Sequence, residues 1–265
     1  MKDIPLRAYE DLDFLSREEL RPVRVQTELL KPQLIMDDEA IQSTVCVFGS
    51  ARTPCPTTAQ ALLHDMKEAF KNDPSDENKA ELAIAQQKLK DSHYYALARE
   101  FSAKMTRFGQ TTGALEYVIC TGGGPGIMEA ANRGAADVHG KSIGLNITLP
   151  HEQYPNQYIT DELNFMFHYF AIRKIHFLMR AKALCAFPGG FGTMDELFET
   201  LTLIQTSKQE KIPVILFGQE FWESIINFDA FVERNVISPE DLDLFTYCED
   251  PDEAVNMILE FHKDK

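Results

Sequence analysis

Short apolar runs alternate with longer stretches of helical character from residue 44 onward. The runs are rich in Val, Ile, Phe and Cys, which is typical of buried strands. Strands are predicted at 44–48, 117–120, 142–147, 164–167, 183–187, 213–217 and 244–247. Helices are predicted near 126–138, 170–182, 193–207 and 219–233, with a last helix from residue 251. Apolar strands separated by helices indicate a Rossmann-like, doubly wound α/β fold, with a mainly parallel sheet and helices on both faces.

Two segments differ from this alternating pattern. Residues 1–42 carry mixed charge without clear periodicity, and we expect an N-terminal extension with short helices. Residues 57–109 are helical in character but are interrupted near 73–78. The segment around 70–92 is strongly charged, which predicts a solvated helical insertion before a packed helix. The chain from 43 to 265 is expected to form a single domain.

Composition and charge argue against several classes of protein. No apolar run approaches the roughly 18–20 residues that a membrane span needs, and the opening residues are too polar for a secretory signal. We therefore expect a cytoplasmic protein without a membrane partner. Lys and Arg number 26 against 41 Asp and Glu, and the net charge of −15 argues against nucleic-acid binding. The five cysteines have no metal-ligand spacing, and we expect no metal.

Three strand-to-helix turns carry the candidate chemistry: 49–52, 121–129 and 188–196. Ligands of open α/β sheets bind at the carboxyl ends of the strands, where these turns are predicted. Glycine lets a backbone approach an anion closely, and the following helix offers unpaired N–H groups. The two glycine-rich turns therefore predict a nucleotide or sugar-phosphate site, although glycines also serve tight turns that bind nothing.

Two common phosphate-binding motifs do not fit these turns. In the dinucleotide fingerprint, a third glycine would fall at Ile127, and no acidic residue ends the next strand at 142–147. The Gly-Lys-Ser triplet at 140–142 precedes a strand, and Gly134 lies one residue too far upstream for a P-loop. We therefore expect neither a dinucleotide nor any other cofactor.

Taken together, the two glycine turns resemble the LOG family. Gly-Gly-Gly-x-Gly-x-Met at 122–128 and Pro-Gly-Gly-x-Gly-Thr-x-x-Glu at 188–196 are similar to its two motifs, in this order. The resemblance covers roughly residues 43–230. The family consists of cytokinin riboside 5′-monophosphate phosphoribohydrolases, formerly called lysine decarboxylases. The extension and the insertion resemble its longer bacterial members, which are related to nucleotide 5′-monophosphate nucleosidases.

The resemblance implies hydrolysis of the N-glycosidic bond of a purine, cytokinin-type nucleoside 5′-monophosphate, which yields free base and ribose 5-phosphate. It implies a nucleotide-monophosphate-binding domain at 43–265 and a homodimer or larger homo-oligomer. Two alternatives stay open: a broad AMP or nucleotide 5′-monophosphate nucleosidase, and a nucleotide-binding sensor without catalysis. The family's catalytic pair matches Arg173, in an Arg-Lys dipeptide, and Glu196.

The residues expected to bind phosphate and nucleotide lie in the three turns or beside the catalytic pair. They are Ser50, Gly122, Gly123, Gly124, Gly126, Met128, Glu129, Lys174, Gly189, Gly190, Gly192 and Thr193.

The expected chemistry explains why a carboxylate and an arginine are needed. Cleavage of a ribosyl–base bond develops positive charge on the sugar, which a carboxylate can stabilise, or the carboxylate can activate water. An arginine can hold phosphate or offset charge elsewhere in the site. The same residues also fit purely structural roles, since Thr193 and Glu196 match a capping box, and Arg173 and Lys174 suit a solvated helix face. Glu129 would favour a helix N-terminus without any ligand.

Overall fold

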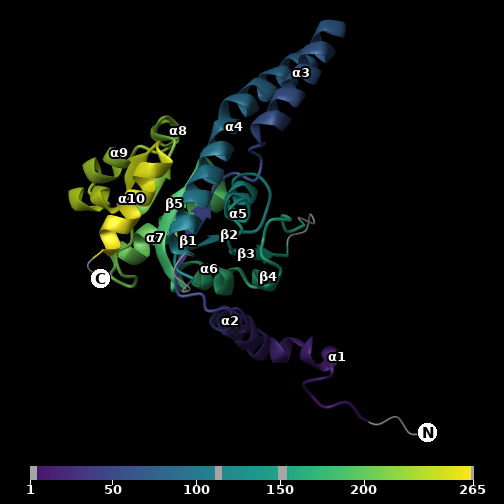
Figure 1. Cartoon of the computed structure of the whole chain (residues 1–265), viewed down its shortest axis with the longest axis vertical. Helices are drawn as coiled ribbons and strands as arrows, with labels where there is room; N and C mark the ends of the chain where they lie inside the picture. Colours follow the sequence, from purple (N-terminus) through teal and green to yellow (C-terminus); the bar gives the residue numbers. More distant parts are fainter. Residues whose placement is uncertain (1–4, 111–114, 149–153, 264–265) are drawn as a thin grey trace.

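The computed structural model describes residues 5–110, 115–148 and 154–263. Its centre is a seven-stranded parallel sheet in the order β4-β3-β2-β1-β5-β6-β7 (Figure 1). The strands are β1 (Thr44–Phe48), β2 (Val118–Thr121), β3 (Ser142–Ile147), β4 (Asn164–Phe167), β5 (Ala181–Ala186), β6 (Val214–Phe217) and β7 (Thr246–Cys248). The predicted Rossmann-like α/β fold is confirmed, and each predicted strand is present with small differences at its ends.

Helices lie between most of the strands, near the predicted places. They are α1 (Leu12–Leu15), α2 (Arg21–Asp38), α3 (Pro56–Asn72), α4 (Asp76–Gly109), α5 (Ile127–Ala136), α6 (Phe170–Met179), α7 (Phe191–Gln205), α8 (Gln219–Ile225), α9 (Phe228–Glu233) and α10 (Pro251–His262). The single helix predicted at 219–233 is wrong, because α8 and α9 are separate. Ile226 has extended backbone, and the Asn227 side chain accepts the Ala230 N–H to begin α9.

Each face of the sheet is covered by its own helices. Alternate residues of β1 point to opposite faces, with Val45 and Val47 on one side and Cys46 and Phe48 on the other. The first pair packs with residues of α4, α5 and α10, and the second with residues of α6 and α7. Burial on both faces explains why the strands read as continuous apolar runs.

The strand order creates a crevice beside the central strand. The chain places β2, β3 and β4 successively on one side of β1, and then places β5 on its other side. The connections that leave the carboxyl ends of β1 and β5 therefore diverge. A doubly wound sheet binds ligands at such a point.

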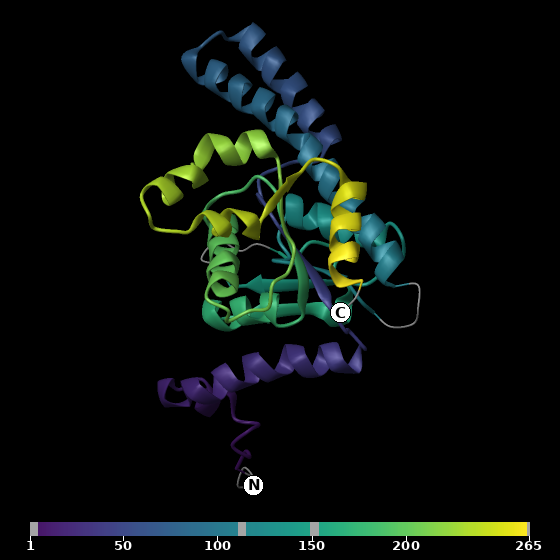
Figure 2. The same ribbon diagram turned by 90° about the vertical axis from the view of Figure 1, so that its left-hand side faces the viewer.

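Helices α3 and α4 form a hairpin that projects from the sheet (Figures 1 and 2). Helix α4 is continuous over 34 residues, so the charged insertion and the packed helix after it are one element. Its buried residues lie mostly from Ser92 onward, where α4 reaches the sheet. Ser75 caps the helix by accepting the Asn78 N–H. The division of the chain into 1–42 and 43–265 stays a prediction.

The N-terminal extension contains one substantial helix, where short helices were expected. Helix α2 has 18 residues and packs along α6, below the sheet in Figure 2. Pro32 and Met36 are buried, whereas Leu30 and Leu34 are half-exposed. Apolar residues thus lie on more than one side of α2, and this arrangement hides the periodicity that predicts a helix.

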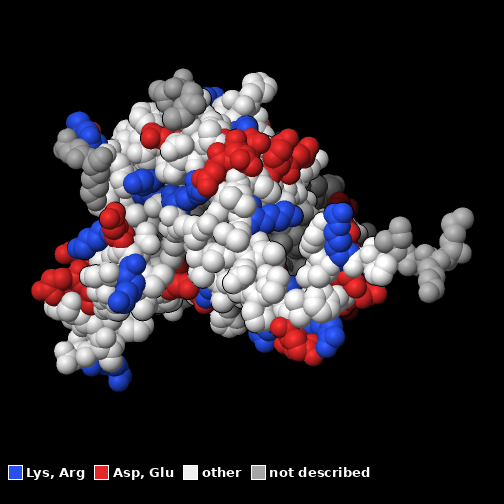
Figure 3. Space-filling view, turned by 90° about the horizontal axis from the view of Figure 1, so that it is seen from below, with Lys and Arg blue, Asp and Glu red and all other residues white. Residues whose placement is uncertain are grey.

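The surface agrees with the mixed charge of the sequence. On the described part of the face in Figure 3, basic side chains are interspersed with acidic ones and do not form a broad patch. In the described ranges, no helix has the length and apolar character needed to cross a bilayer.

Candidate functional site

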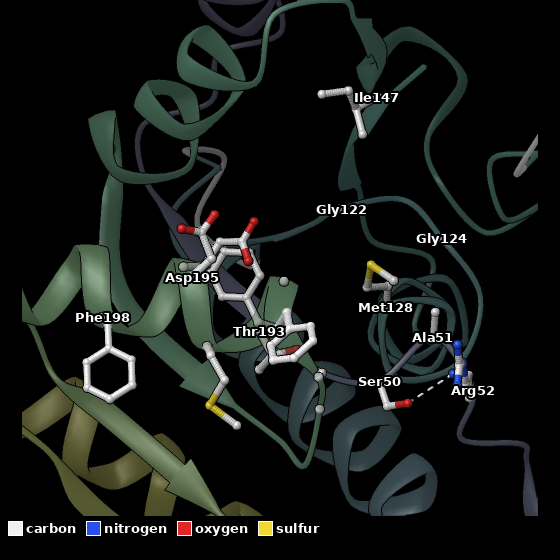
Figure 4. A pocket seen from close by; sticks show the side chains of 18 of the residues that line it. Ser50, Ala51, Arg52, Gly122, Gly124, Met128, Ile147, Thr193, Asp195 and Phe198 are labelled. Carbon is white, nitrogen blue, oxygen red and sulfur yellow. Dashed lines mark hydrogen bonds between the residues drawn. The ribbon is translucent and has the colours of Figure 1, made fainter. Parts of the chain in front are cut away.

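A cavity of about 940 Å³ lies at the carboxyl ends of β1, β2, β3 and β5 (Figure 4). The predicted residues that line it are Ser50, Gly122, Gly124, Met128, Arg173, Gly189, Gly190, Gly192, Thr193 and Glu196. The cavity is therefore at the crevice that the strand order creates, and the three turns predicted to carry chemistry meet there.

Backbone hydrogen bonds hold the three turns against one another. The Ser50 N–H donates to the Pro188 carbonyl at 2.9 Å, and the Ile127 N–H donates to the Ser50 carbonyl at 3.1 Å. Gly126 has φ of 72°, and a Cβ there would lie 2.2 Å from the Ser50 carbonyl oxygen. Glycine at 126 is thus required by the close packing of two turns.

A buried polar network shapes the turn after β2. The Thr121 hydroxyl donates to Asn132 Oδ1 at 2.7 Å and accepts the Gly123 N–H at 2.9 Å. Asn156 Nδ2 donates to Asn132 Oδ1 and to the carbonyls of Gly123 and Gly124 at 2.9–3.2 Å. Gly123 has φ of +75°. The network therefore fixes a turn that includes a left-handed residue.

Helix α7 begins at Phe191, with Gly190 as its N-cap. Thr193 is therefore inside the first turn, and the capping box considered for Thr193 and Glu196 is wrong. The N–H groups of Phe191, Gly192 and Thr193 have no backbone acceptor among the described residues, as expected of a helix start. A 15-residue helix directs these donors and its positive dipole end toward the cavity.

The glycines of the second turn serve different purposes. A Cβ at Gly189 would lie 2.2 Å from Thr193 Oγ1, so this glycine makes room for the hydroxyl. A Cβ at Gly190 would meet no atom of the described residues within 4 Å. Packing within the protein therefore does not require glycine at 190, whereas an anion resting on this turn would.

Arg173 projects from the first turn of α6 into the cavity. It is only 9% exposed, so the solvated helix face considered for it is wrong. Its Nε donates to the Leu145 carbonyl at 2.7 Å, and its guanidinium lies 5.1 Å from the centre of the Phe177 ring. A Cβ at Gly122 would lie 2.6 Å from Arg173 Nη2. Burial lowers the pKa of Arg173, and the charge of Glu196 opposes that shift.

Glu196 lines the same cavity and is 8% exposed. Burial is the largest influence on the pKa of its carboxyl and raises it, whereas the positive charge of Arg173 acts in the opposite direction. The net result is a pKa of about 7. Within the described chain, neither group forms an ion pair with the other or with a third residue. The carboxyl can therefore exchange a proton near neutral pH while it faces the cavity.

Four predicted binding residues do not line the cavity. Lys174 pairs with Asp195 at 2.7 Å and with Glu199 at 3.5 Å, which joins α6 to α7. Glu129 accepts the Tyr95 hydroxyl at 2.7 Å and thus faces α4. Gly123 and Gly126 shape the turn that they belong to. The structure therefore does not support direct contact of these four residues with a ligand in the cavity.

Several lining residues were not predicted. Arg52 is exposed at the cavity, and its N–H donates to Ser50 Oγ at 3.0 Å (Figure 4). Asn146 lines the cavity at the carboxyl end of β3. Both positions follow from the rule that strand ends face the site. The support from Asn132 and Asn156 had no signal in the sequence, because the two residues are distant along the chain.

Large apolar side chains form another part of the cavity wall. They are Phe48, Phe170, Phe191, Phe198, Ile225 and Ile226. Phe191 is 95% exposed. The cavity thus combines polar donors at the glycine turns with an apolar surface suited to a planar ring. In the described ranges, no three His, Cys, Asp or Glu side chains are placed to hold a metal ion.

Known proteins resemble this chain in sequence and in fold. A family model described as "Possible lysine decarboxylase" matches residues 128–258. A pyrimidine/purine nucleotide 5′-monophosphate nucleosidase of Escherichia coli (strain K12) is 34% identical over 121 residues. A cytokinin riboside 5′-monophosphate phosphoribohydrolase of Arabidopsis thaliana is 30% identical over 90 residues. The resemblance to the LOG family is confirmed.

These matches cover limited parts of the LOG-related proteins. The first covers 42% of this chain and 26% of the E. coli protein, and the second covers 34% of this chain and 42% of the Arabidopsis protein. The X-ray structure of the structural-genomics target TM1055 is similar over 82% of this chain and 99% of its own, with a TM-score of 0.50 and 17% identity. This last likeness supports the fold.

Proposed function

We propose that this LOG-related chain hydrolyses the N-glycosidic bond of a purine nucleoside 5′-monophosphate to free base and ribose 5-phosphate. The observation that carries the proposal is the burial of Arg173 and Glu196 in one cavity with two glycine turns. The names of the E. coli and Arabidopsis relatives support it, since both act on nucleoside 5′-monophosphates.

The phosphate binds at the second glycine turn in this proposal. The N–H groups at the start of α7 and the Thr193 hydroxyl supply donors, and Gly190 lets the anion approach the backbone. The base lies toward the apolar wall. This arrangement places the ribose between the two, near Glu196 and Arg173.

The reaction breaks the bond between C1′ and the base nitrogen, and its electron pair leaves with the base. A water oxygen forms the new bond to C1′, and the base nitrogen gains a proton. Glu196 as a carboxylate stabilises the developing sugar cation or takes a proton from the water. Its pKa of about 7 suits it to release that proton again. The positive charge of Arg173 offsets negative charge in the buried site.

The test is incubation of the purified protein with AMP, isopentenyl-AMP and a pyrimidine monophosphate, followed by measurement of free base. Release from isopentenyl-AMP in strong preference supports the cytokinin-type activity. Similar release from all three supports a broad nucleosidase, which the name of the E. coli relative favours. Tight binding without release from any of them indicates a sensor and contradicts the proposal. Activity should survive a chelator, because no step needs a metal.

The oligomeric state is also a proposal. We infer that the chain forms a homodimer or a larger homo-oligomer, since Phe191 is 95% exposed and Phe170 and Ile225 are half-exposed beside the cavity. The inference is tested by comparing the sedimentation of the wild type with that of the Phe191→Ser variant. A monomeric wild type contradicts the inferred self-association. A cytoplasmic location and a role in cytokinin production stay predictions.

A further inference from the structure

Helix α6 carries Arg173 in its first turn, yet its own sequence does little to fix where it begins. Tyr169 is the N-cap, and within the described chain its side chain caps no helical N–H. Tyrosine is not a residue that serves well at this position. The turn between β4 and α6 therefore needs support from another part of the protein.

Glu28 of α2 supplies that support. Its two carboxylate oxygens accept the N–H groups of His168 and Tyr169, at 2.8 and 3.1 Å. A carboxylate bonded to two backbone donors at a helix start is a strong, charge-assisted contact. The Tyr169 carbonyl in turn accepts the Arg173 N–H at 3.1 Å. Tyr169 thus connects Glu28 to the backbone of Arg173 through two successive hydrogen bonds.

The N-terminal extension also holds the far end of α6. Arg180, the residue after α6, donates to Asp37 at 2.6 Å and to the Ile41 carbonyl at 2.6 Å. Between the two ends, the ring of His176 forms a hydrogen bond of 3.1 Å with the Glu28 carbonyl. Helix α2 therefore contacts α6 along its length. The N-terminal extension thus packs against the helix that carries Arg173.

We propose that Glu28 is a positioning residue for Arg173, and that the N-terminal extension completes the active site by fixing the β4–α6 turn. This inference rests on the proposed function. The role belongs to the contacts of Glu28 with backbone, so the residue itself touches no substrate. Loss of the carboxylate frees the turn and lets the guanidinium shift within the cavity. Even a small displacement of a group near the reacting atoms lowers turnover substantially.

The experiment compares Glu28→Ala with Asp38→Ala in the full-length protein. Asp38 is an exposed carboxylate of the same helix, so its removal matches the loss of charge. We expect Glu28→Ala to lower kcat for AMP by about tenfold or more, with a smaller change in KM, because phosphate binds at α7. Asp38→Ala should stay within about twofold of the wild type, as is usual for a surface change. Glu28→Gln, which keeps one acceptor oxygen, should recover part of the activity.

A double-mutant cycle separates positioning from general destabilisation. If Glu28 acts through Arg173, Glu28→Ala should cost nothing further in an Arg173→Ala background. Equal losses in both backgrounds, or wild-type kcat in Glu28→Ala, would overturn the inference. If Glu28→Ala does not fold, as judged by thermal melting, the cycle is measured with Glu28→Gln. A wild type that releases no base from any monophosphate contradicts the proposed function instead, so the two failures are distinguishable.

Discussion

Burial opposes the ionisation of both Arg173 and Glu196, whereas their opposite charges favour it. Burial lowers the pKa of the guanidinium and raises that of the carboxyl to about 7. A buried carboxyl without an ion pair costs stability in its charged form, and stability alone does not account for its presence. Groups with such shifts gather at functional sites. Glu196 is therefore the residue whose replacement tests the chemistry most directly.

Replacement of Glu196 by glutamine should separate binding from turnover. The amide keeps the size of the side chain but has neither the charge nor the basicity that the reaction needs. We expect kcat for AMP to fall by about 10²-fold or more, with AMP affinity by calorimetry within a few-fold of the wild type. Glu199→Gln, one turn further along α7, is the matched control and should keep most of its activity. Near-normal turnover with a lower Tm would show that Glu196 only supports the fold.

The same variant should be more stable than the wild type at high pH. The folded protein holds a proton on Glu196 up to a pKa of about 7, whereas the unfolded chain releases it near 4.5. The stability contributed by the protonated carboxyl is thus complete below pH 4.5 and is lost as pH rises through 7. Glutamine stays neutral, so its advantage should grow to about 3 kcal/mol at most by pH 8. Urea denaturation at pH 5 and pH 8 measures it, and an equal difference at both would contradict the assigned pKa.

At the scale of the elements, strands were easier to predict than helix limits. Burial on both faces gives strands such as Val214–Phe217 an apolar run that no surface helix shares. The start of α7 depends instead on Gly190 adopting extended backbone, which the Thr-x-x-Glu pattern concealed. Helix α2 was hidden by apolar residues on two sides and by the proline within it, Pro32. Its packing partner, α6, lies far along the chain. Such tertiary contacts leave no local signal.

The turn that leads into α7 gives a prediction about Gly189 and Gly190. Gly190→Ala adds a methyl group that meets no atom in the part of the chain that the structure describes, so the free energy of unfolding should stay the same or rise slightly. The methyl group would occupy the proposed phosphate position, and we expect KM for AMP to rise by about tenfold or more. Gly189→Ala is the contrast, because its Cβ would meet Thr193 Oγ1 and should lower the unfolding free energy. Unchanged AMP kinetics in Gly190→Ala would place the phosphate elsewhere.

At the scale of the whole molecule, the location of the site was more predictable than its complete composition. The strand order brings the three turns to one cavity, as expected for a doubly wound sheet. The family motifs led to Arg173 and Glu196, which the fold places in that cavity. Motifs did not distinguish ligand-facing residues from their neighbours, because Lys174 turns to Asp195 and Glu129 turns to Tyr95. Adjacent helical positions face different directions, and packing decides which faces the cavity.

Because the net charge of the chain is −15, only groups at the site itself can attract a phosphate dianion. The field of the whole chain repels such a ligand, so donors at the cavity must supply the attraction. If they do, the phosphate also helps to place the ribose for reaction, and its removal should lower kcat as well as affinity. We expect kcat/KM for adenosine to be at least about 10²-fold below that for AMP. Inorganic phosphate should inhibit AMP hydrolysis competitively, with sodium chloride of equal ionic strength as the control. Comparable kcat/KM for the two substrates would contradict the assignment of the glycine turns, even if Glu196 proved essential.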